Sequence, residues 1–341
     1  MLRTTTLFSL FGVLFLFING CREVAENNTP HPVLSDWTLQ ELLPGGRFDA
    51  IAWLGNDQVI VGSRNPDPGH LFRSNDLGQT WERLATTIPD EITCLMSAGE
   101  GRVYLLTGTS QFYRSDDYGD TWQYLAQVSG NEAYHWFKLS YGIAVTEAGT
   151  VLVSDTAESG GHIYRSTDHG ASWQDLGAIS PHALYRFEHT SDGILVNGWQ
   201  GEVYKSTDDG QTWRRTERLT ESPLYATEHL GAGVNLQASE DGRIFISKDA
   251  GETWRELDMQ TEAADDFAVL GPSVVLLSTY TDAKSMYLSE DGGLTWQNIG
   301  PVDPQDPEDW LDHFISIQQP DRTLLIGGTN QGKVIRAEVL R

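Results

Sequence analysis

The octapeptide Ser74-Asn75-Asp76-Leu77-Gly78-Gln79-Thr80-Trp81 is the first of six copies of one pattern, Ser-x-Asp-x-Gly-x-Thr/Ser-Trp. The serines of successive copies stand 41, 51, 40, 41 and 42 residues apart. Self-similarity at a nearly fixed period is typical of repeat architectures, in which every repeat is one supersecondary unit. The chain of 341 residues is therefore expected to be built from repeats over most of its length.

Each copy has the composition of a tight turn between two strands. The Asp carboxylate can accept hydrogen bonds from backbone N–H groups of its own turn, Gly allows a positive φ, and Trp is expected to begin the next strand. Because the turn already uses these atoms, we expect a structural role, and no calcium or sugar binding, for Asp76, Asp117, Asp168, Asp208, Asp249 and Asp291. The cations before the serine recur with the repeat and are interpreted as structural as well: Arg73, Arg114, Arg165 and Lys205.

Every repeat contains the pattern of four short strands. In the fourth repeat these are 184–189, 194–198, 202–206 and 212–218. Four strands in about 42 residues predict one blade of a β-propeller. The expected fold class is all-β, with four-stranded antiparallel blades.

The two ends of the chain are predicted to share a blade. Segments 313–317, 322–328 and 332–337 look like three strands without a closing motif, whereas 37–42 matches the strand that follows the motif elsewhere. We expect the N-terminal strand to complete the last of seven blades, which leaves no free sheet edge. Six blades is the alternative.

The N-terminal segment looks like an export signal. Arg3 precedes an apolar run over 7–18 that ends at Ile18-Asn19-Gly20-Cys21, which resembles a bacterial lipobox. We predict a lipoprotein signal peptide at 1–21 with lipid on Cys21, a tether at 22–35 and the propeller at 36–341. The alternative is an ordinary signal peptide with an incidental cysteine. Cys94, the other cysteine, is interpreted as a core residue.

The net charge of the chain excludes nucleic-acid binding as its function. The chain has 23 Lys and Arg against 48 Asp and Glu, a net charge of −25, which repels nucleic acid and anionic lipid headgroups. There is no nucleophile elbow, phosphate-binding loop, dinucleotide fingerprint or metal-spaced His/Cys set. No cofactor and no metal are expected.

The candidate binding residues fall in loops at the propeller face opposite the motifs. The insertion that lengthens one spacing to 51 residues contains Tyr134, His135 and Trp136, and two further tryptophans stand in loops of the same face, Trp199 and Trp310. Aromatic side chains with a few polar neighbours suit both a protein partner and a polysaccharide. The basic residues predicted near that mouth include Arg47, Arg64 and Arg186. Alternatively, the insertion folds back and its aromatic side chains plug the channel.

The six motif copies resemble the Asp-box, or BNR repeat. Propellers of this kind include sialidases, xyloglucanases and sortilin receptors, and the sialidase resemblance implies an arginine triad, here Arg47, Arg64 and Arg186, with a catalytic tyrosine and acid. In size, blade number, motif density and leader, the chain is most similar to the photosystem II assembly and stability factors. That resemblance covers nearly the whole mature chain and implies a non-enzymatic scaffold for a membrane protein.

The predicted function is a lipid-anchored binding or assembly scaffold in the bacterial cell envelope, periplasmic or surface-exposed. Whether the chain is an enzyme is left open, although the scaffold is favoured because no catalytic set is visible. The alternative is a sialidase-like or other glycoside hydrolase that uses two carboxylates at the channel mouth, where Asp265, Asp266, Asp309 and Asp312 are among the candidates.

Overall fold

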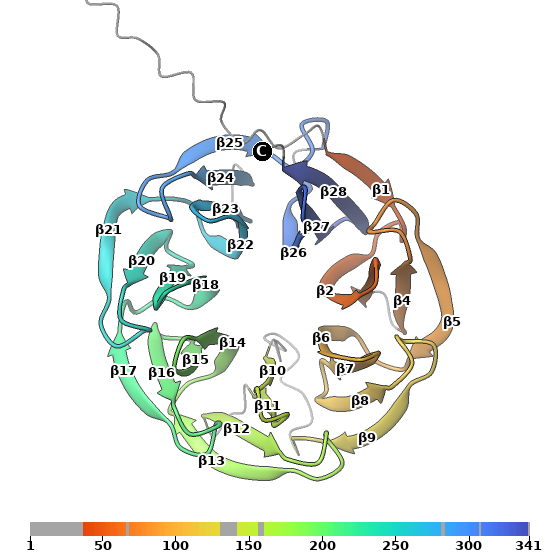
Figure 1. The fold of residues 1–341 in the computed structure, drawn as a ribbon, viewed down its shortest axis with the longest axis horizontal. Helices are drawn as coiled ribbons and strands as arrows, with labels where there is room; N and C mark the ends of the chain where they lie inside the picture. Colours follow the sequence, from red (N-terminus) through yellow and green to blue (C-terminus); the bar gives the residue numbers. More distant parts are fainter. Residues whose placement is uncertain are drawn as a thin grey trace, which may run out of the picture. The chain divides into compact units, whose positions relative to one another are not determined.

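The computed structural model describes residues 37–65, 68–129, 142–155, 160–280, 284–306 and 308–339. Within these ranges the chain forms 28 strands in seven four-stranded antiparallel sheets, and Figure 1 shows the sheets arranged as blades around a central axis. The seven-bladed prediction is confirmed. In the described ranges no helix is long and apolar enough to cross a membrane.

Each blade runs from an inner strand to an outer one. Blade 1 contains β2 (Arg47–Gly55), β3 (Gln58–Asn65), β4 (Gly69–Ser74) and β5 (Glu82–Ile88); blade 2 contains β6 (Ile92–Gly99), β7 (Arg102–Thr107), β8 (Gln111–Ser115) and β9 (Gln123–Gln127). Blade 3 contains β10 (Ile143–Val145), β11 (Val151–Ser154), β12 (Gly161–Ser166) and β13 (Gln174–Ser180); blade 4 contains β14 (Leu184–Thr190), β15 (Gly193–Gly198), β16 (Glu202–Ser206) and β17 (Arg214–Arg218). Blade 5 contains β18 (Leu224–Gly231), β19 (Val234–Ser239), β20 (Arg243–Ser247) and β21 (Arg255–Gln260); blade 6 contains β22 (Ala264–Gly271), β23 (Val274–Thr279), β24 (Ser285–Ser289) and β25 (Gln297–Pro301).

The last blade, blade 7, joins the two ends of the repeat region. Its order is β1 (Thr38–Glu41), β28 (Lys333–Val339), β27 (Thr323–Thr329) and β26 (Leu311–Gln318), with Leu39 opposite Ile335. Trp37 and Leu39 pack against the buried cluster that contains Ile335. The predicted closure by the N-terminal strand is therefore confirmed.

The six motif copies form one hydrogen-bonded turn, which we call the repeat turn. In blade 4, Ser206 Oγ donates to Asp208 Oδ1 (2.8 Å) and accepts from Gly210 N (3.0 Å), while Asp208 also accepts from Thr212 N and Oγ1 (2.9 and 2.6 Å). The same set recurs in the other five copies. Both carboxylate oxygens of the motif aspartate thus accept hydrogen bonds within the turn.

The fourth strand starts later than the sequence predicted. It begins at Arg214 in blade 4, not at residue 212, because Trp213 still belongs to the turn: its Nε1 donates to the carbonyl of Gly210 at 3.1 Å. Four other copies have the same bond, whereas Trp81 Nε1 has no partner among the described residues. The tryptophan therefore closes the turn, and the strand starts after it.

The repeat turns also join neighbouring blades. The residue before the motif glycine has a positive φ in all six copies, and in four of them its carbonyl accepts from a cation of the preceding blade: Arg336 to Leu77, Arg73 to Tyr118, Arg114 to His169 and Arg165 to Asp209. The cations that the repeat predicted to be structural thus bridge two blades.

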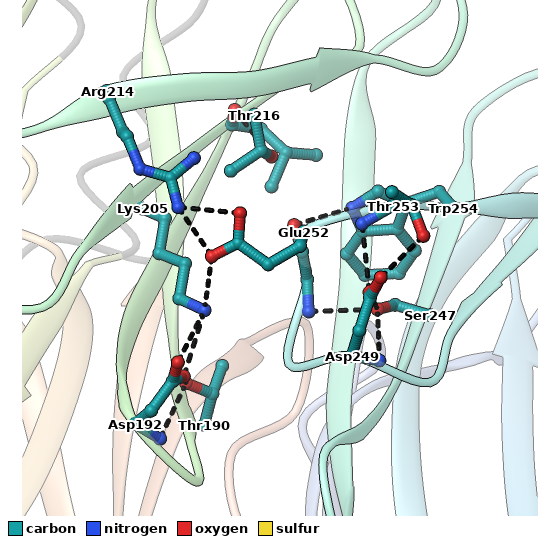
Figure 2. A network of polar contacts seen from close by, with 12 residues as sticks. Thr190, Asp192, Lys205, Arg214, Thr216, Ser247, Asp249, Glu252, Thr253 and Trp254 are labelled. Carbon is teal, nitrogen blue, oxygen red and sulfur yellow. Dashed lines mark hydrogen bonds and ion pairs between the residues drawn. The ribbon is translucent and has the colours of Figure 1, made fainter.

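Blade 4 meets blade 5 through a lysine. Lys205 Nζ lies 2.9 Å from Asp192 Oδ1 and 2.9 Å from Glu252 Oε1, and its side chain is fully buried. Arg214 holds the other oxygen of Glu252 at 2.6 Å (Figure 2). A charged residue from one blade is therefore anchored in the repeat turn of the next.

Candidate functional site

The face opposite the repeat turns contains a pocket, here called the mouth pocket. It is a cavity of about 260 Å³, and the residues that line it come from blades 1, 4, 5, 6 and 7. They are Arg47, Asp49, Arg64, Tyr185, Arg186, Tyr225, Asp265, Tyr280, Trp310, Asp312 and His313. The inner strands start at this face and run toward the repeat turns, so residues at their first positions line the pocket. The pocket therefore lies at the face where the sequence predicted binding residues.

A recurring backbone irregularity places these side chains. In blade 1, Phe48 pairs with Ser63 and Ala50 with Gly62, so Asp49 has no residue opposite it. The same β-bulge occurs at the start of the inner strand in blades 2, 4, 5, 6 and 7. The extra residues are Asp49, Thr93, Tyr185 with Arg186, Tyr225, Asp265 and Asp312, and all but Thr93 line the pocket. Bulges next to functional sites commonly redirect a side chain in this way.

The three predicted arginines meet in the mouth pocket, and each is paired with a carboxylate. Arg64 Nη1 lies 2.8 Å from Asp49 Oδ2, and Arg47 Nη2 lies 2.9 Å from Asp312 Oδ1. Arg186 is bonded to Asp266. Their positive charges are therefore matched within the protein.

Trp310 also lies in the pocket. Arg47 and Lys284 approach its ring, with Arg47 Cζ at 5.8 Å and Lys284 Nζ at 5.2 Å from the centroid, within the range of a cation–π contact. Its Nε1 donates to Asp312 Oδ1 at 2.8 Å. Trp310 is thus packed among charged groups rather than standing alone as a stacking surface.

Of the other predicted aromatic residues, the structure describes only Trp199. Trp199 contacts the ring of Tyr185, with centroids 6.1 Å apart, and so lies beside the pocket. Tyr134, His135 and Trp136 lie outside the described residues, as does Cys21. The grouping of the three tryptophans therefore stays a prediction.

Sequence reasoning missed the three tyrosines of the pocket. Tyr185, Tyr225 and Tyr280 form a chain of ring contacts, with centroids 5.4 and 6.3 Å apart. A signal was present, because Leu184-Tyr185 and Leu224-Tyr225 stand at equivalent positions of two successive repeats. Tyr280, which follows β23, had no such repeat signal.

The carboxyl groups of the pocket have unusual titration behaviour. Burial raises the pKa of Asp265 to about 7, against the opposing charges of Arg186 and Arg47. Burial and the charge of Asp49 raise the pKa of Asp312 well above its ordinary value. Burial also acts on Asp266, but the charges of Arg186 and His313 outweigh it and lower the pKa.

A second cavity of about 300 Å³, the channel cavity, adjoins the first and is lined by inner strands of all seven blades. Glu188, Glu228 and Asp266 face it. Burial and the charge of Asp266 raise the pKa of Glu188 to about 8, and burial with the charge of Glu188 raises that of Glu228. Cys94 also lines this cavity, and burial raises the pKa of its thiol to about 11, as suits a packing role.

Within the described ranges, no group of three or more His, Cys, Asp or Glu is placed to hold a metal ion. The remaining acidic candidate near the mouth has another task, since Asp309 binds Lys333 at 3.0 Å. What the site offers is a small pocket with aromatic walls, paired arginines and carboxyl groups of raised pKa.

Comparison with known proteins finds similar folds but no similar sequence. No model of a protein family matches the chain, and no curated protein matches it. Among solved structures, YCF48 bound to D1 peptide has a TM-score of 0.65 at 19% identity, covering 89% of this chain and 96% of that one. YCF48 from Cyanidioschyzon merolae has a TM-score of 0.65 at 15% identity, covering 89% and 98%. Virginiamycin B lyase from Staphylococcus aureus, in a catalytically inactive form with quinupristin, has a TM-score of 0.71 at 12% identity, covering 89% and 100%. At these identities the likeness establishes the fold.

Proposed function

We propose that the chain is a lipid-anchored Asp-box propeller of the bacterial cell envelope, and that its mouth pocket binds a protein partner without catalysing a reaction. Cys21 would carry the lipid, and residues 22–35 would form the tether between membrane and propeller.

The observation that supports binding is the convergence of side chains from five blades on one pocket, to which each blade contributes the extra residue or residues of the same β-bulge. Clustered aromatic and arginine side chains are common at the centres of protein interfaces. The structural neighbour that holds a D1 peptide supports a protein rather than a polysaccharide as partner.

Affinity capture tests this proposal. The full chain is used as bait on detergent-solubilised envelopes of the native host, beside a Tyr280→Ala/Trp310→Ala variant of equal folded stability. Trp53→Ala is the matched control, because Trp53 is 42% exposed on β2, near the repeat-turn end of that strand. We expect one envelope protein to be recovered by the parent and by Trp53→Ala, and to be lost with the pocket variant. Equal recovery by all three contradicts the proposal.

The anchor is tested separately. Cys21→Ser removes the atom that would carry the lipid, so we expect this variant to move from the membrane fraction to the soluble fraction of the envelope. If Cys21→Ser remains in the membrane fraction, the prediction of a lipid anchor on Cys21 is wrong.

Glycoside hydrolysis is the second candidate. Asp265 and Asp312 line one pocket, and the charge of Asp265 contributes to the raised pKa of Asp312, as a neighbouring carboxylate raises the pKa of the acid in a glycosidase. The test is release of methylumbelliferone from aryl glycosides, sialosides included, by the parent and by Asp265→Asn. If the parent hydrolyses a glycoside and Asp265→Asn does not, the protein is a glycoside hydrolase and the scaffold proposal is wrong. If the parent hydrolyses none of them, these compounds are excluded as substrates.

A further inference from the structure

The mouth pocket contains a carboxyl group, that of Asp265, that no described side chain holds by a direct contact. Arg64 is shared between Asp49 and Glu91, Arg47 between Asp49 and Asp312, and Arg186 binds Asp266. Asp265 lines the same pocket and makes no hydrogen bond or ion pair with any other described residue. The three arginines and His313 thus share five carboxyl groups, and Asp265 is the one that none of them contacts directly among the described residues.

A second carboxylate oxygen is left without a donor. Asp312 is only 2% exposed, and its Oδ1 accepts from both Arg47 and Trp310. Its Oδ2 is buried and accepts no hydrogen bond within the described part of the chain. Burial raises the pKa of Asp312, so a cation placed beside this carboxyl group would stabilise its charged form.

The titration of these groups agrees with an unmet demand for positive charge. Burial raises the pKa of Asp265 to about 7, and the neighbouring charges of Asp49 and Asp266 add to the rise against those of Arg186 and Arg47. Near neutral pH a proton on Asp265 therefore partly removes its negative charge. A cation that enters can replace that proton.

The walls of the pocket suit a cation as well. Asp265 lines the pocket together with Tyr225 and Tyr280, and its charge contributes to the raised pKa values of both phenols. The faces of tyrosine rings attract cations, especially where water is excluded. A volume of about 260 Å³ is below that of a typical pocket for a drug-sized ligand and suits one inserted side chain.

We propose that the mouth pocket receives a cationic side chain, lysine or arginine, of the protein partner, seated beside the carboxyl groups of Asp265 and Asp312 and against the tyrosine rings. This inference rests on the proposed binding function and specifies its chemistry. The net charge of −25 also draws a basic partner surface toward the propeller.

Three short peptides test the inference: acetyl-Gly-Gly-Lys-Gly-Gly-amide and its norleucine and glutamate counterparts. Binding to the full chain in detergent is measured by ligand-observed NMR titration. We expect the lysine peptide to bind about tenfold more tightly than the norleucine peptide, since a charge-assisted hydrogen bond and a cation–π contact are gained. The preference should weaken as salt is added.

The variants assign the preference to the pocket. Asp265→Asn, which breaks no hydrogen bond among the described residues, should reduce the lysine preference to about twofold or less, and Asp312→Asn should act in the same direction. If Asp312→Asn fails to fold because Arg47 loses its partner, Asp265→Asn still decides. Asp258→Asn is the matched control, because Asp258 is exposed on the outer strand β21, and it should leave the preference unchanged.

The results separate this inference from the proposed function. Equal binding of the lysine and norleucine peptides, or a lysine preference that survives Asp265→Asn, overturns the cation site. Preferential binding of the glutamate peptide overturns it as well and assigns the pocket to anions through its arginines. In either case capture of a partner that depends on Tyr280 and Trp310 still supports the proposed function. A lysine preference without such capture supports the cation site and contradicts the proposed scaffold function.

Discussion

Lys205 shows how one residue links two blades. Its side chain is fully buried, although its partners Asp192 and Glu252 are partly exposed. In the sequence it is only the fourth member of a recurring set of cations before the motif serine. The structure shows that the charge, and not only the aliphatic stem, is used.

We expect Lys205→Met to lower the free energy of unfolding by about 1–3 kcal/mol, because methionine keeps the packing of the stem but loses two charge-assisted contacts. A double-mutant cycle with Glu252→Gln should show a coupling energy of about 0.5–3 kcal/mol in urea unfolding. Lys248→Met, at an exposed position of the next repeat turn, should change stability by less than about 0.5 kcal/mol. No coupling in the cycle would mean that the buried ion pair adds nothing to blade contact.

Glu188 gives the propeller a pH dependence of defined sign. Its pKa is raised from 4.5 to about 8 by burial and by the charge of Asp266, with Glu228 also facing it and Arg186 opposing. The folded state therefore binds this proton more tightly than the unfolded state does. The resulting stability is complete below the unfolded pKa and is lost as pH rises through about 8.

We expect the free energy of unfolding to fall between about pH 5 and pH 8.5, and Glu188→Gln to reduce that fall and to be the more stable protein at the upper end. Denaturant unfolding across the pH series measures both. Glu217→Gln, on the exposed strand β17, is the control and should keep the slope of the parent. An unchanged slope for Glu188→Gln would show that the charge of this channel residue does not limit stability.

At the scale of the element, the repeat turn does more than reverse the chain. Its glycine packs on an apolar side chain of the preceding blade in every copy: Gly78 on Ile326, Gly119 on Ile60, Gly170 on Phe112, Gly210 on Leu152, Gly251 on Leu195 and Gly293 on Leu236. A motif that looks like a local corner in the sequence is thus also a contact between blades. Two separate constraints, positive φ and lack of space, act on the same residue.

Blade 6 separates these two constraints, because its turn has two successive glycines of positive φ. A Cβ on Gly293 would lie 2.7 Å from Leu236 Cδ1, whereas a Cβ on Gly292 would meet nothing within 4 Å. We expect Gly293→Ala to cost about 2–4 kcal/mol and Gly292→Ala about 1 kcal/mol, measured by urea unfolding. If the two substitutions lower the free energy of unfolding equally, only the backbone angle matters, and the contact between the glycine and Leu236 adjusts to the added methyl group.

At the scale of the whole molecule, stability depends on closing the ring with β1. This strand pairs with β28, and Trp37 and Leu39 pack against the core cluster that contains Ile335. Without β1, the last blade has three strands, and β28 presents an unpaired edge.

We expect a chain that starts at Leu42 to have a Tm more than about 5 °C below that of a chain that starts at Trp37, and to self-associate as its concentration rises. Thermal unfolding and analytical ultracentrifugation measure the two effects. The chain that starts at Trp37 is the control, because it retains the whole of β1. A stable, monomeric protein that starts at Leu42 would contradict a role of β1 in closure.

The sequence by itself determined the repeat, the number of blades and the strand that closes the ring. The reason is that the repeat turn is made of hydrogen bonds between residues at most four positions apart, as from Gly210 N to Ser206 Oγ and from Thr212 N to Asp208 Oδ1. Such bonds depend on local residue types at fixed spacing, so they can be read without a structure. The period of the motif then predicts how much chain each blade receives, and the leftover strand at each end indicates the closure.

Only the tertiary structure decided which charged groups pair with one another at the mouth of the propeller. Arg47 pairs with Asp312 across 265 positions of the sequence, and Arg186 with Asp266 across 80. Which charges meet depends on how seven blades close around one axis and on where a β-bulge turns the side chain of each inner strand. The same geometry leaves Asp265 without a partner among the described residues and buries one oxygen of Asp312. Burial and distance set the balance of charge in the pocket, and neither is a property of residues that are neighbours in the chain.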